Sequence, residues 1–164
     1  MTPKTNVMRQ LDARHIPYRC YEYNSVPGIT GADIARILNQ DPAQVFKTLV
    51  TFSNTNKYYV FMIPVDADLD LKLAAAAVVE KSISMLKQRD LLDLTGYIHG
   101  GCSPIGMKKQ FATVIDASAN NFNTIIYSAG RVGYQVETTV DDLVKIIPLR
   151  FANICNNASG QVSA

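Results

Sequence analysis

The sequence contains no tryptophan, only two histidines and three cysteines, and no apolar run of the roughly 18 residues that a membrane-spanning helix needs. Three cysteines are an odd number, and their spacing fits no metal-binding motif, so they favour reduced thiols in a cytosol. The first residues lack the apolar core of a signal peptide. We therefore expect a cytoplasmic protein that uses neither a membrane partner nor a metal.

The common catalytic motifs are also missing. No nucleophile elbow, Walker loop or dinucleotide-binding glycine motif occurs. His15 and His99 lack the sequence partners of a catalytic triad. Cys102, between a glycine and Ser-Pro, stands where a nucleophile could stand, but nothing nearby would lower its pKa. The sequence thus predicts no side-chain nucleophile of a known type and no cofactor.

The composition is that of one globular domain. The 164 residues are 48% hydrophobic and 18% charged, which suits a single core-forming unit. The net charge of +2 permits contact with a polyanion but falls short of a dedicated nucleic-acid binder. We expect a folded domain over residues 1–155 and a flexible small-residue tail over residues 156–164.

Hydrophobic periodicity predicts short strands alternating with short helices. The expected helices are one that starts at Thr2-Pro3, and those at 33–38, 71–79, 87–94 and 139–147. The expected strands are 18–23, 45–52, 58–65, 82–85, 111–115, 124–127 and 132–136. This order predicts a single mixed α/β domain, with spacing too irregular for a doubly wound nucleotide-binding fold.

One charged residue interrupts the apolar strand 45–52. Both faces of this strand are largely apolar, so we expect it to be central in its sheet. Lys47 then has two interpretations. It is either an edge lysine that discourages aggregation, or a fixed positive charge at the rim of a pocket.

Two glycine-rich loops are the other conspicuous features. Residues 100–106 and 128–133 each combine glycines with a serine. Both are consistent with simple tight turns. Together with a lysine on a central strand, they also suit binding of a small carbonyl compound by main-chain N–H groups, because glycine permits close approach to the backbone.

These segments resemble a known family. Phe46-Lys47-Thr48-Leu49 and the segments 100–109 and 128–133 match, in order and spacing, motifs of the YbaK/EbsC proteins, which are free-standing relatives of the editing domain in bacterial prolyl-tRNA synthetase. The similarity extends from the first helix to about Ile154. It implies a mixed α/β domain whose curved, partly barrel-like mixed sheet is flanked by short helices. It also implies trans-editing of Cys-tRNA(Pro), and in some members of Cys-tRNA(Cys).

The resemblance assigns roles to particular residues. The catalytic positions fall on Lys47, Gly100, Gly101 and Ser128, and the substrate-binding positions on Tyr21, Thr30, Thr48, Cys102, Gly130 and Arg131. In the family, the thiol of the substrate cysteine is thought to attack its own ester carbonyl. We expect main-chain N–H groups at Gly100-Gly101, with Ser128, to bind the oxyanion, and Lys47 to hold the terminal adenosine and its phosphate.

Several questions stay open at this stage. The pocket aromatic of some members falls near Thr30, where none stands, and an acidic residue is replaced by Gln135, so the accepted amino acid is undetermined. A deacylase for alanine or serine, or a tRNA- or synthetase-binding module without turnover, are alternatives. Expected partners are tRNA(Pro) and prolyl-tRNA synthetase. Lys47 and Thr48 should point to opposite strand faces, unless a bulge intervenes or Thr48 acts through its backbone.

Overall fold

The computed structural model describes residues 3–156 as helices and strands in alternation. The helices are α1 (Asn6–Ala13), α2 (Gly31–Ile37), α3 (Leu71–Ala77), α4 (Leu91–Thr95) and α5 (Val140–Ile146), with 3₁₀ turns η1 (Gln88–Asp90) and η2 (Ala117–Asn121). The strands are β1 (Arg19–Glu22), β2 (Phe46–Ser53), β3 (Tyr58–Pro64), β4 (Asp68–Leu69), β5 (Ile83–Met85), β6 (Ala112–Asp116), β7 (Thr124–Ser128), β8 (Tyr134–Thr139), β9 (Leu149–Ala152) and β10 (Cys155–Asn156). The predicted mixed α/β class is confirmed.

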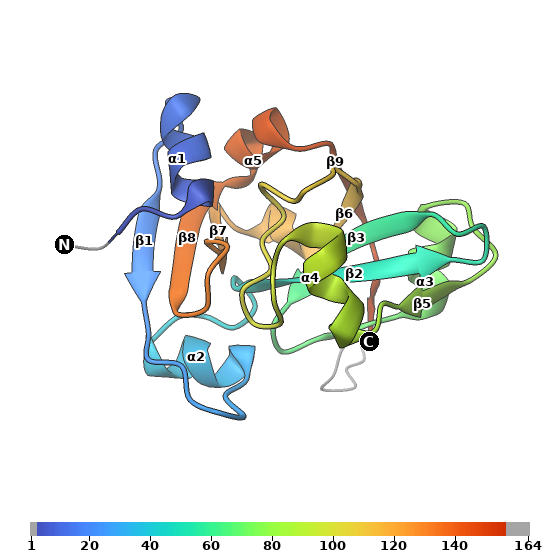
Figure 1. Ribbon diagram of the computed structural model, residues 1–164, viewed down its shortest axis with the longest axis horizontal. Coiled ribbons are helices and arrows are strands. Elements are labelled where there is room, and N and C mark those ends of the chain that lie inside the picture. Colours follow the sequence, from blue (N-terminus) through green and yellow to red (C-terminus); the bar gives the residue numbers. More distant parts are fainter. Residues whose placement is uncertain (1–2, 157–164) are drawn as a thin grey trace.

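Hydrogen bonding groups the described strands into three sheets (Figure 1). The largest has the order β5-β2-β3-β6-β9, the second has the order β1-β8-β7, and β4 pairs with β10. The β2–β3 hairpin is antiparallel, whereas β6 pairs in parallel with both β3 and β9. These sheets are not closed into a barrel, so the partly barrel-like description is wrong in that respect.

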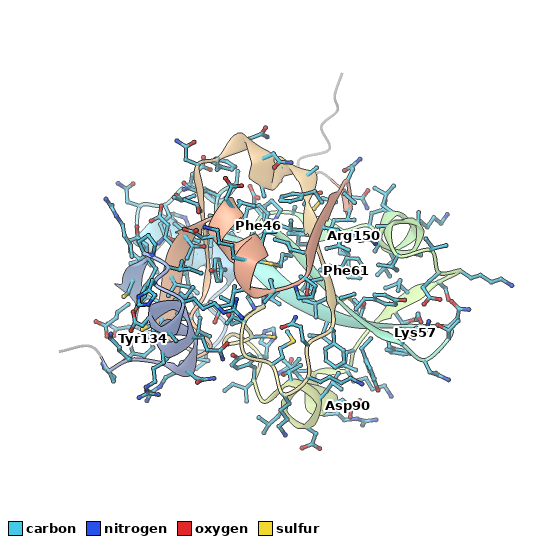
Figure 2. The ribbon with its side chains drawn as sticks, turned by 90° about the horizontal axis from the view of Figure 1, so that it is seen from above. Phe46, Lys57, Phe61, Asp90, Tyr134 and Arg150 are labelled. Atoms are coloured by element: carbon cyan, nitrogen blue, oxygen red, sulfur yellow. The ribbon has the colours of Figure 1, made fainter. Side chains whose placement is uncertain are left out.

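Apolar side chains from both larger sheets share the main core. The largest buried cluster packs α1 and α5 against β7, β8 and the start of β2, and includes Val7, Phe46, Tyr127 and Leu143. A second cluster around Phe61 and Ile63 lies under α3. In Figure 2, Phe46 and Phe61 lie in the interior of the molecule. This shared core fixes the β1–β8–β7 sheet relative to β2.

Side-chain caps define where the helices begin. Thr30, Asp70 and Thr139 accept main-chain N–H groups of the first turns of α2, α3 and α5, respectively. The helices predicted at 71–79 and 139–147 are present and begin after the caps Asp70 and Thr139, and α4 ends at Gly96 in the left-handed conformation. The predicted start of the first helix at Thr2-Pro3 is wrong, because Thr5 caps α1; Thr2 itself lies outside the described residues.

The remaining differences lie in short strands. The strands β4, β9 and β10 are not among those predicted, because two- to four-residue strands carry little periodicity. Asn156 belongs to β10 rather than to a tail, and the rest of the predicted tail lies outside the described residues. No helix among residues 3–156 is both long and apolar enough to cross a membrane.

Candidate active site

The strand β2 is central along only part of its length. It pairs with β3 from Phe46 to Phe52, but with β5 only from Thr51 to Ser53. The first half of β2 therefore leaves one edge without a partner in its own sheet. The expectation that the whole strand is central holds only for its second half.

That open edge is bridged to the other large sheet by one pair of residues. Val45 forms an isolated parallel bridge with Ile126 of β7, and the Ile126 N–H donates to the Gln44 carbonyl at 3.0 Å. Beyond this bridge the two strands are not paired. Lys47 and Ser128 each follow the bridge by two residues, so the strand alternation places them on the same side of the diverging strands. The structure thus places two predicted catalytic residues on the same side of the interval in which β2 and β7 are no longer paired, called the gap below.

Lys47 is partly buried on β2 and is not engaged by any carboxylate. None of the ion pairs or side-chain hydrogen bonds within the described part of the chain involves it. It lies on the strand face of Val45, which packs with Tyr21 and Ile126, and of Leu49. An unpaired ammonium group at this position is available to an anionic ligand.

Thr48 lies on the opposite face of β2 from Lys47. The pairing of Lys47 with Ile63 and of Thr48 with Met62 continues without a bulge, so the two side chains point apart. Thr48 Oγ1 is buried and has no hydrogen-bond partner among residues 3–156. On the open edge of the strand, the carbonyls of Gln44 and Val50 accept hydrogen bonds from the N–H groups of Ile126 and Leu86. Because main-chain groups alternate along a strand, the main-chain groups of Thr48 point to the same edge.

Tyr21 is anchored by a carboxylate that the sequence analysis did not single out. Its hydroxyl donates to Glu137 Oε1, and Thr124 Oγ1 donates to Glu137 Oε2. The hydrogen bond to Glu137, followed by burial, raises the pKa of Tyr21 above its ordinary value. Side chains alternate along β8, and Val136 points into the core. This alternation, which the sequence shows, places Gln135 and Glu137 on the other face.

Gln135 lies opposite both Tyr21 and Ser128 in the sheet. It is buried, with 6% of its surface exposed, and its Oε1 accepts a 2.8 Å hydrogen bond from Gln40 Nε2. Gln40 Oε1 is itself buried and has no partner among the described residues. A neutral amide pair therefore occupies the position where the family resemblance implies an acidic residue.

The two glycine loops are in direct contact. A Cβ atom on Gly101 would lie 3.0 Å from the main-chain nitrogen of Val132 and 3.3 Å from the carbonyl carbon of Arg131. Gly100, with φ of +88°, lies beside the Val132 side chain. The absence of a side chain at Gly101 thus allows the loop that follows α4 to pack on the β7–β8 turn (Figure 1).

Tyr97 contacts both glycine loops. Its hydroxyl donates to the Ile105 carbonyl, and its ring lies 3.0 Å from where a Cβ on Gly130 would be. Gly130 has φ of +88°, which a glycine adopts without strain. Burial raises the pKa of Tyr97 to about 12. Gly130 therefore has a packing role that the sequence did not reveal.

The hydrogen-bond donors of the loops differ from the expected set. The Gly101 N–H already donates to the Ile98 carbonyl at 2.9 Å, so the assignment of this group to an oxyanion is corrected. Gly100 and Cys102 have no main-chain donor bond within residues 3–156. Ser128 Oγ accepts the Gly130 N–H at 3.0 Å, which leaves the Ser128 hydroxyl hydrogen free to donate outward.

Cys102 is a packing residue. It is buried with Val50, Val60 and Met107, and burial raises the pKa of its thiol to about 12. At neutral pH it is therefore a thiol rather than a nucleophilic thiolate. Its side chain supports β2 on the Thr48 face.

Thr30 and Arg131 lie at the periphery. Thr30 is exposed, and its hydroxyl oxygen accepts the Asp33 N–H at 3.1 Å in a capping box. Arg131 is exposed on the β7–β8 turn, with its guanidinium 5.5 Å from the centre of the Tyr134 ring. The structure therefore places Lys47 and Ser128 on the same side of β2 and β7, brings the two glycine loops into contact, and places Thr30 in a helix cap.

The chain is similar to known aminoacyl-tRNA editing proteins. A family model described as "Aminoacyl-tRNA editing domain" matches residues 26–146. A relative from Enterococcus faecalis, which carries the provisional name Cys-tRNA(Pro)/Cys-tRNA(Cys) deacylase EbsC, is 41% identical over 152 residues, covering 92% of this chain and 93% of that protein.

Solved structures share the fold. The crystal structure of a hypothetical protein, APE2540, has a TM-score of 0.82 at 22% identity, covering 92% of this chain and 99% of that one. A structure provisionally described as a trans-editing enzyme for prolyl-tRNA synthetase has a TM-score of 0.80 at 19% identity, covering 95% and 99%. At these identities the likeness concerns the fold alone. The family match and the 41% identical relative show more: this chain belongs to the aminoacyl-tRNA editing domain family.

Proposed function

We propose that the protein is a trans-editing deacylase that removes cysteine from mischarged Cys-tRNA(Pro) in the cytoplasm, and that Cys-tRNA(Cys) is its second candidate substrate. The observation that carries this proposal is the placement of Lys47 and Ser128 on the same side of β2 and β7, each two residues beyond the Val45–Ile126 bridge. The name of the Enterococcus relative supports the choice of substrate.

The need for such an activity follows from the limits of selection by size. A synthetic site that holds proline also admits cysteine, because small apolar differences give only about 10- to 200-fold discrimination. A separate site that cleaves the wrong ester restores accuracy. The mixed donor set around the gap, with main-chain and hydroxyl groups, suits an ester carbonyl that becomes an oxyanion.

The reaction is one in which the substrate provides the nucleophile. The cysteinyl thiol forms a bond to its own ester carbonyl carbon, and the bond between that carbon and the ribose oxygen breaks. The products are a cyclic thioester and free tRNA, and the thiol proton ends on the ribose oxygen. This route fits a site whose own buried thiol, that of Cys102, has its pKa raised to about 12.

Each group at the gap then has a distinct role. Lys47, unpaired in the described structure, holds the terminal phosphate and favours a nearby thiolate. The Ser128 hydroxyl and the main-chain N–H groups of Gly100 and Cys102 donate to the oxyanion. Tyr21, fixed by Glu137, and the Gln40–Gln135 pair form the wall that receives the amino acid.

Recognition of the whole tRNA needs further contacts. With a net charge of +2, the protein can neutralise few phosphates, so we expect weak and salt-sensitive binding. We propose that prolyl-tRNA synthetase presents the mischarged tRNA and so supplies specificity. Gel mobility of a synthetase–tRNA(Pro) complex with and without this protein tests that partnership.

The test of the activity is a deacylation panel. Cys-, Ala-, Ser- and Pro-tRNA(Pro) are incubated with wild type, Lys47→Ala and the control Lys57→Ala, whose exposed lysine lies at the far hairpin (Figure 2). We expect rapid loss of cysteine alone, a fall of about 10²-fold or more for Lys47→Ala, and no change for Lys57→Ala. Near-normal turnover by Lys47→Ala contradicts the site assignment.

The same panel separates the alternatives. If Ala-tRNA(Pro) is cleaved as fast as Cys-tRNA(Pro), the substrate thiol is not the nucleophile and the protein is a deacylase for a small residue. If tRNA mobility shifts while every ester keeps its lifetime, the protein is a binding module without turnover.

A further inference from the structure

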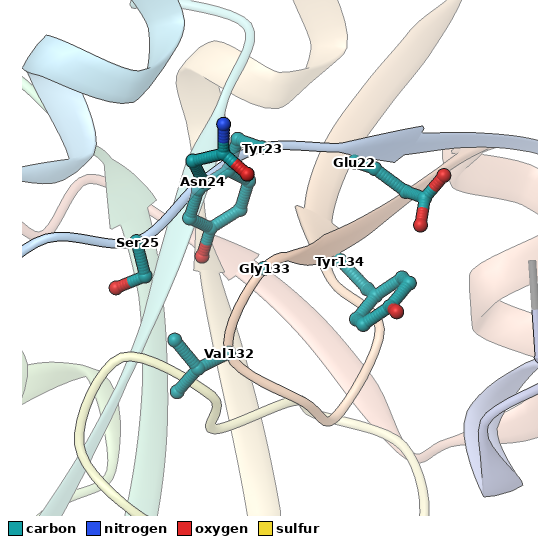
Figure 3. Close-up of a pocket in the computed structure, with 7 residues that line it drawn as sticks. All are labelled: Glu22, Tyr23, Asn24, Ser25, Val132, Gly133 and Tyr134. Atoms are coloured by element: carbon teal, nitrogen blue, oxygen red, sulfur yellow. The ribbon is translucent and has the colours of Figure 1, made fainter.

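A cavity lies next to the candidate active site, at the end of the β1–β8–β7 sheet. It measures about 450 Å³ and is lined by residues 22–25 and 132–134 (Figure 3). Gly133 makes it possible, since its φ is +97° and a Cβ there would lie 3.2 Å from the Tyr23 carbonyl oxygen. The turn can therefore close against the end of β1 while leaving the opening beside Tyr23.

The cavity and the active site share a wall. Val132 lines the cavity, and the same residue is the one that Gly100 and Gly101 pack against. Tyr23 follows Tyr21 by two residues at the end of β1, so alternation places both on the side of the sheet that carries Gln135. A ligand that reaches from the glycine loops past Val132 enters this cavity next.

The lining favours a planar, neutral, polar group over an anion. It contains two tyrosine rings, the Asn24 amide, the Ser25 hydroxyl and the Glu22 carboxylate, and no lysine or arginine. A carboxylate in the wall disfavours a phosphate. Aromatic rings with amide and carboxylate groups are instead what proteins use to stack an unpaired nucleobase and to read its amino group.

The two rings are not equivalent. The Arg131 guanidinium lies over the Tyr134 ring at 5.5 Å, and Tyr134 also packs against the main core, so this ring is held in place. The Tyr23 hydroxyl has no hydrogen bond among the residues that the structure describes, and its ring borders the opening together with Ser25 and Val132 (Figure 3). Tyr23 is thus the ring available for stacking, with exposed Arg131 near the path of a phosphate.

From this we infer that the cavity is a nucleobase subsite for the unpaired RNA strand that precedes the esterified adenosine. The inference rests on the proposed function, because it takes the ester to lie at the glycine loops. A tRNA ends in the unpaired sequence CCA, whose bases all carry an exocyclic amino group, and the Asn24 amide oxygen offers an acceptor for such a group.

The test uses two separate measurements on the full chain. The first is binding of the uncharged trinucleotide CCA, followed by NMR shifts and titration. The second is deacylation of Cys-tRNA(Pro) and of the cysteinyl ester of adenosine alone, which lacks the preceding bases. The variants are Tyr23→Leu, Tyr23→Phe, Ser25→Glu and the control Tyr58→Leu, which removes a tyrosine from the far hairpin.

For Tyr23→Leu we expect about 5- to 100-fold weaker trinucleotide binding, the range for loss of one stacked base. Its KM for Cys-tRNA(Pro) should rise with kcat retained, and cleavage of the adenosine ester should match wild type. Tyr23→Phe, which keeps the ring, and Tyr58→Leu should behave as wild type. Ser25→Glu, at an exposed position that tolerates substitution, should weaken binding of the trinucleotide by repelling its phosphates.

The outcomes separate the two proposals. Trinucleotide binding that is unchanged in both Tyr23→Leu and Ser25→Glu, or NMR shifts confined to other parts of the chain, overturns the subsite. A wild-type protein that cleaves neither ester overturns the proposed deacylase function, and the trinucleotide titration still decides whether the cavity binds a base.

Discussion

Lys47 and Ser128 occupy equivalent places on two strands that are joined by one bridge and are not paired beyond it. Each lies two residues beyond the Val45–Ile126 bridge, and neither strand pairs with the other after it. A fixed cation and a hydroxyl therefore face the same opening, although 81 positions separate them in the sequence. The gap exists because β5 pairs with β2 only from Thr51 onward, which leaves the edge at Thr48 uncovered.

The hydroxyl of Thr48 gives the first prediction. Its Oγ1 is buried without a partner in the described structure, so Thr48→Val removes an unsatisfied polar atom. We expect the free energy of unfolding to stay constant or to rise by up to about 1 kcal/mol. Because this side chain is buried and points away from Lys47, so that only the Thr48 main chain reaches the open edge, kcat/KM for Cys-tRNA(Pro) should stay unchanged. Urea unfolding and deacylation kinetics measure the two effects.

A matched control lies on the same strand. Thr51 is fully buried, and its Oγ1 donates to the Tyr59 carbonyl at 2.9 Å. Thr51→Val should therefore cost about 1 kcal/mol of stability and leave kcat/KM unchanged. If Thr48→Val destabilises the protein as much as Thr51→Val, the Thr48 hydroxyl has a hydrogen-bond partner in solution.

The contact between the glycine loops gives the second prediction. Gly101→Ala places a Cβ 3.0 Å from the main-chain nitrogen of Val132, so one loop must shift by a few tenths of an ångström. We expect kcat/KM to fall about 10- to 100-fold, since small misplacements of positioning groups have effects of this size. Stopped-time deacylation assays and a thermal melt of the same sample measure activity and stability.

Gly28→Ala separates packing from backbone strain. Gly28 has φ of +82°, and no atom lies within 4 Å of a Cβ placed there. This variant should lose about 1 kcal/mol of stability through the unfavourable backbone conformation and keep its kcat/KM. An equal loss of activity in both variants would mean that Gly101 acts through general destabilisation.

The sequence predicts the elements of this site better than their relationships. The strand around Lys47, the strand that follows it and the helices at 71–79 and 139–147 follow from hydrophobic alternation and periodicity, and all are present. The contact between the two glycine loops was not predicted, although glycine at position 101 is what permits it. Motif spacing alone located the lysine, the serine and both loops.

The remaining features depend on long-range packing, which local patterns do not encode. The open edge at Thr48 exists because β5 is only three residues long, and the burial of Gln135 depends on Gln40 from a distant loop. Likewise, the Gly101 N–H donates to the Ile98 carbonyl, and this bond depends on the geometry of the turn. Tyr97 donates one hydrogen bond and Glu137 accepts two from other elements, and the sequence carries no signature of these bonds.

Thiol reactivity gives the third prediction. Burial raises the pKa of Cys102 to about 12, and burial followed by the charge of Asp116 raises that of Cys155, whereas Cys20 is exposed. At pH 8 we expect iodoacetamide to alkylate Cys20 and to leave Cys102 and Cys155 unmodified, because the thiolate is the reactive form. Peptide mass spectrometry quantifies each site, and a sample in denaturant should label at all three. Alkylation of Cys102 at the rate of Cys20 in the folded protein would contradict its burial.

The fourth prediction concerns stability in alkali. Burial raises the pKa of Tyr97 to about 12, above the value of about 10 for a tyrosine in an unfolded chain. A group whose pKa is raised by folding binds its proton more tightly in the native state. Its contribution to stability is therefore complete below pH 10 and is lost as the pH rises from 10 to 12.

The variant Tyr97→Phe isolates this effect. It keeps the ring that packs at Gly130 but removes both the titrating group and the hydrogen bond to the Ile105 carbonyl. We expect it to be less stable than wild type at pH 8 by about 1 kcal/mol, the value of one hydrogen bond. Between pH 10 and pH 12 its free energy of unfolding should fall less steeply with pH than that of wild type. Expressed as protons released on unfolding, the two slopes should differ by up to one. Urea unfolding at half-unit pH steps measures both curves. Parallel curves would show that the Tyr97 hydroxyl ionises as freely in the folded protein as in the unfolded chain.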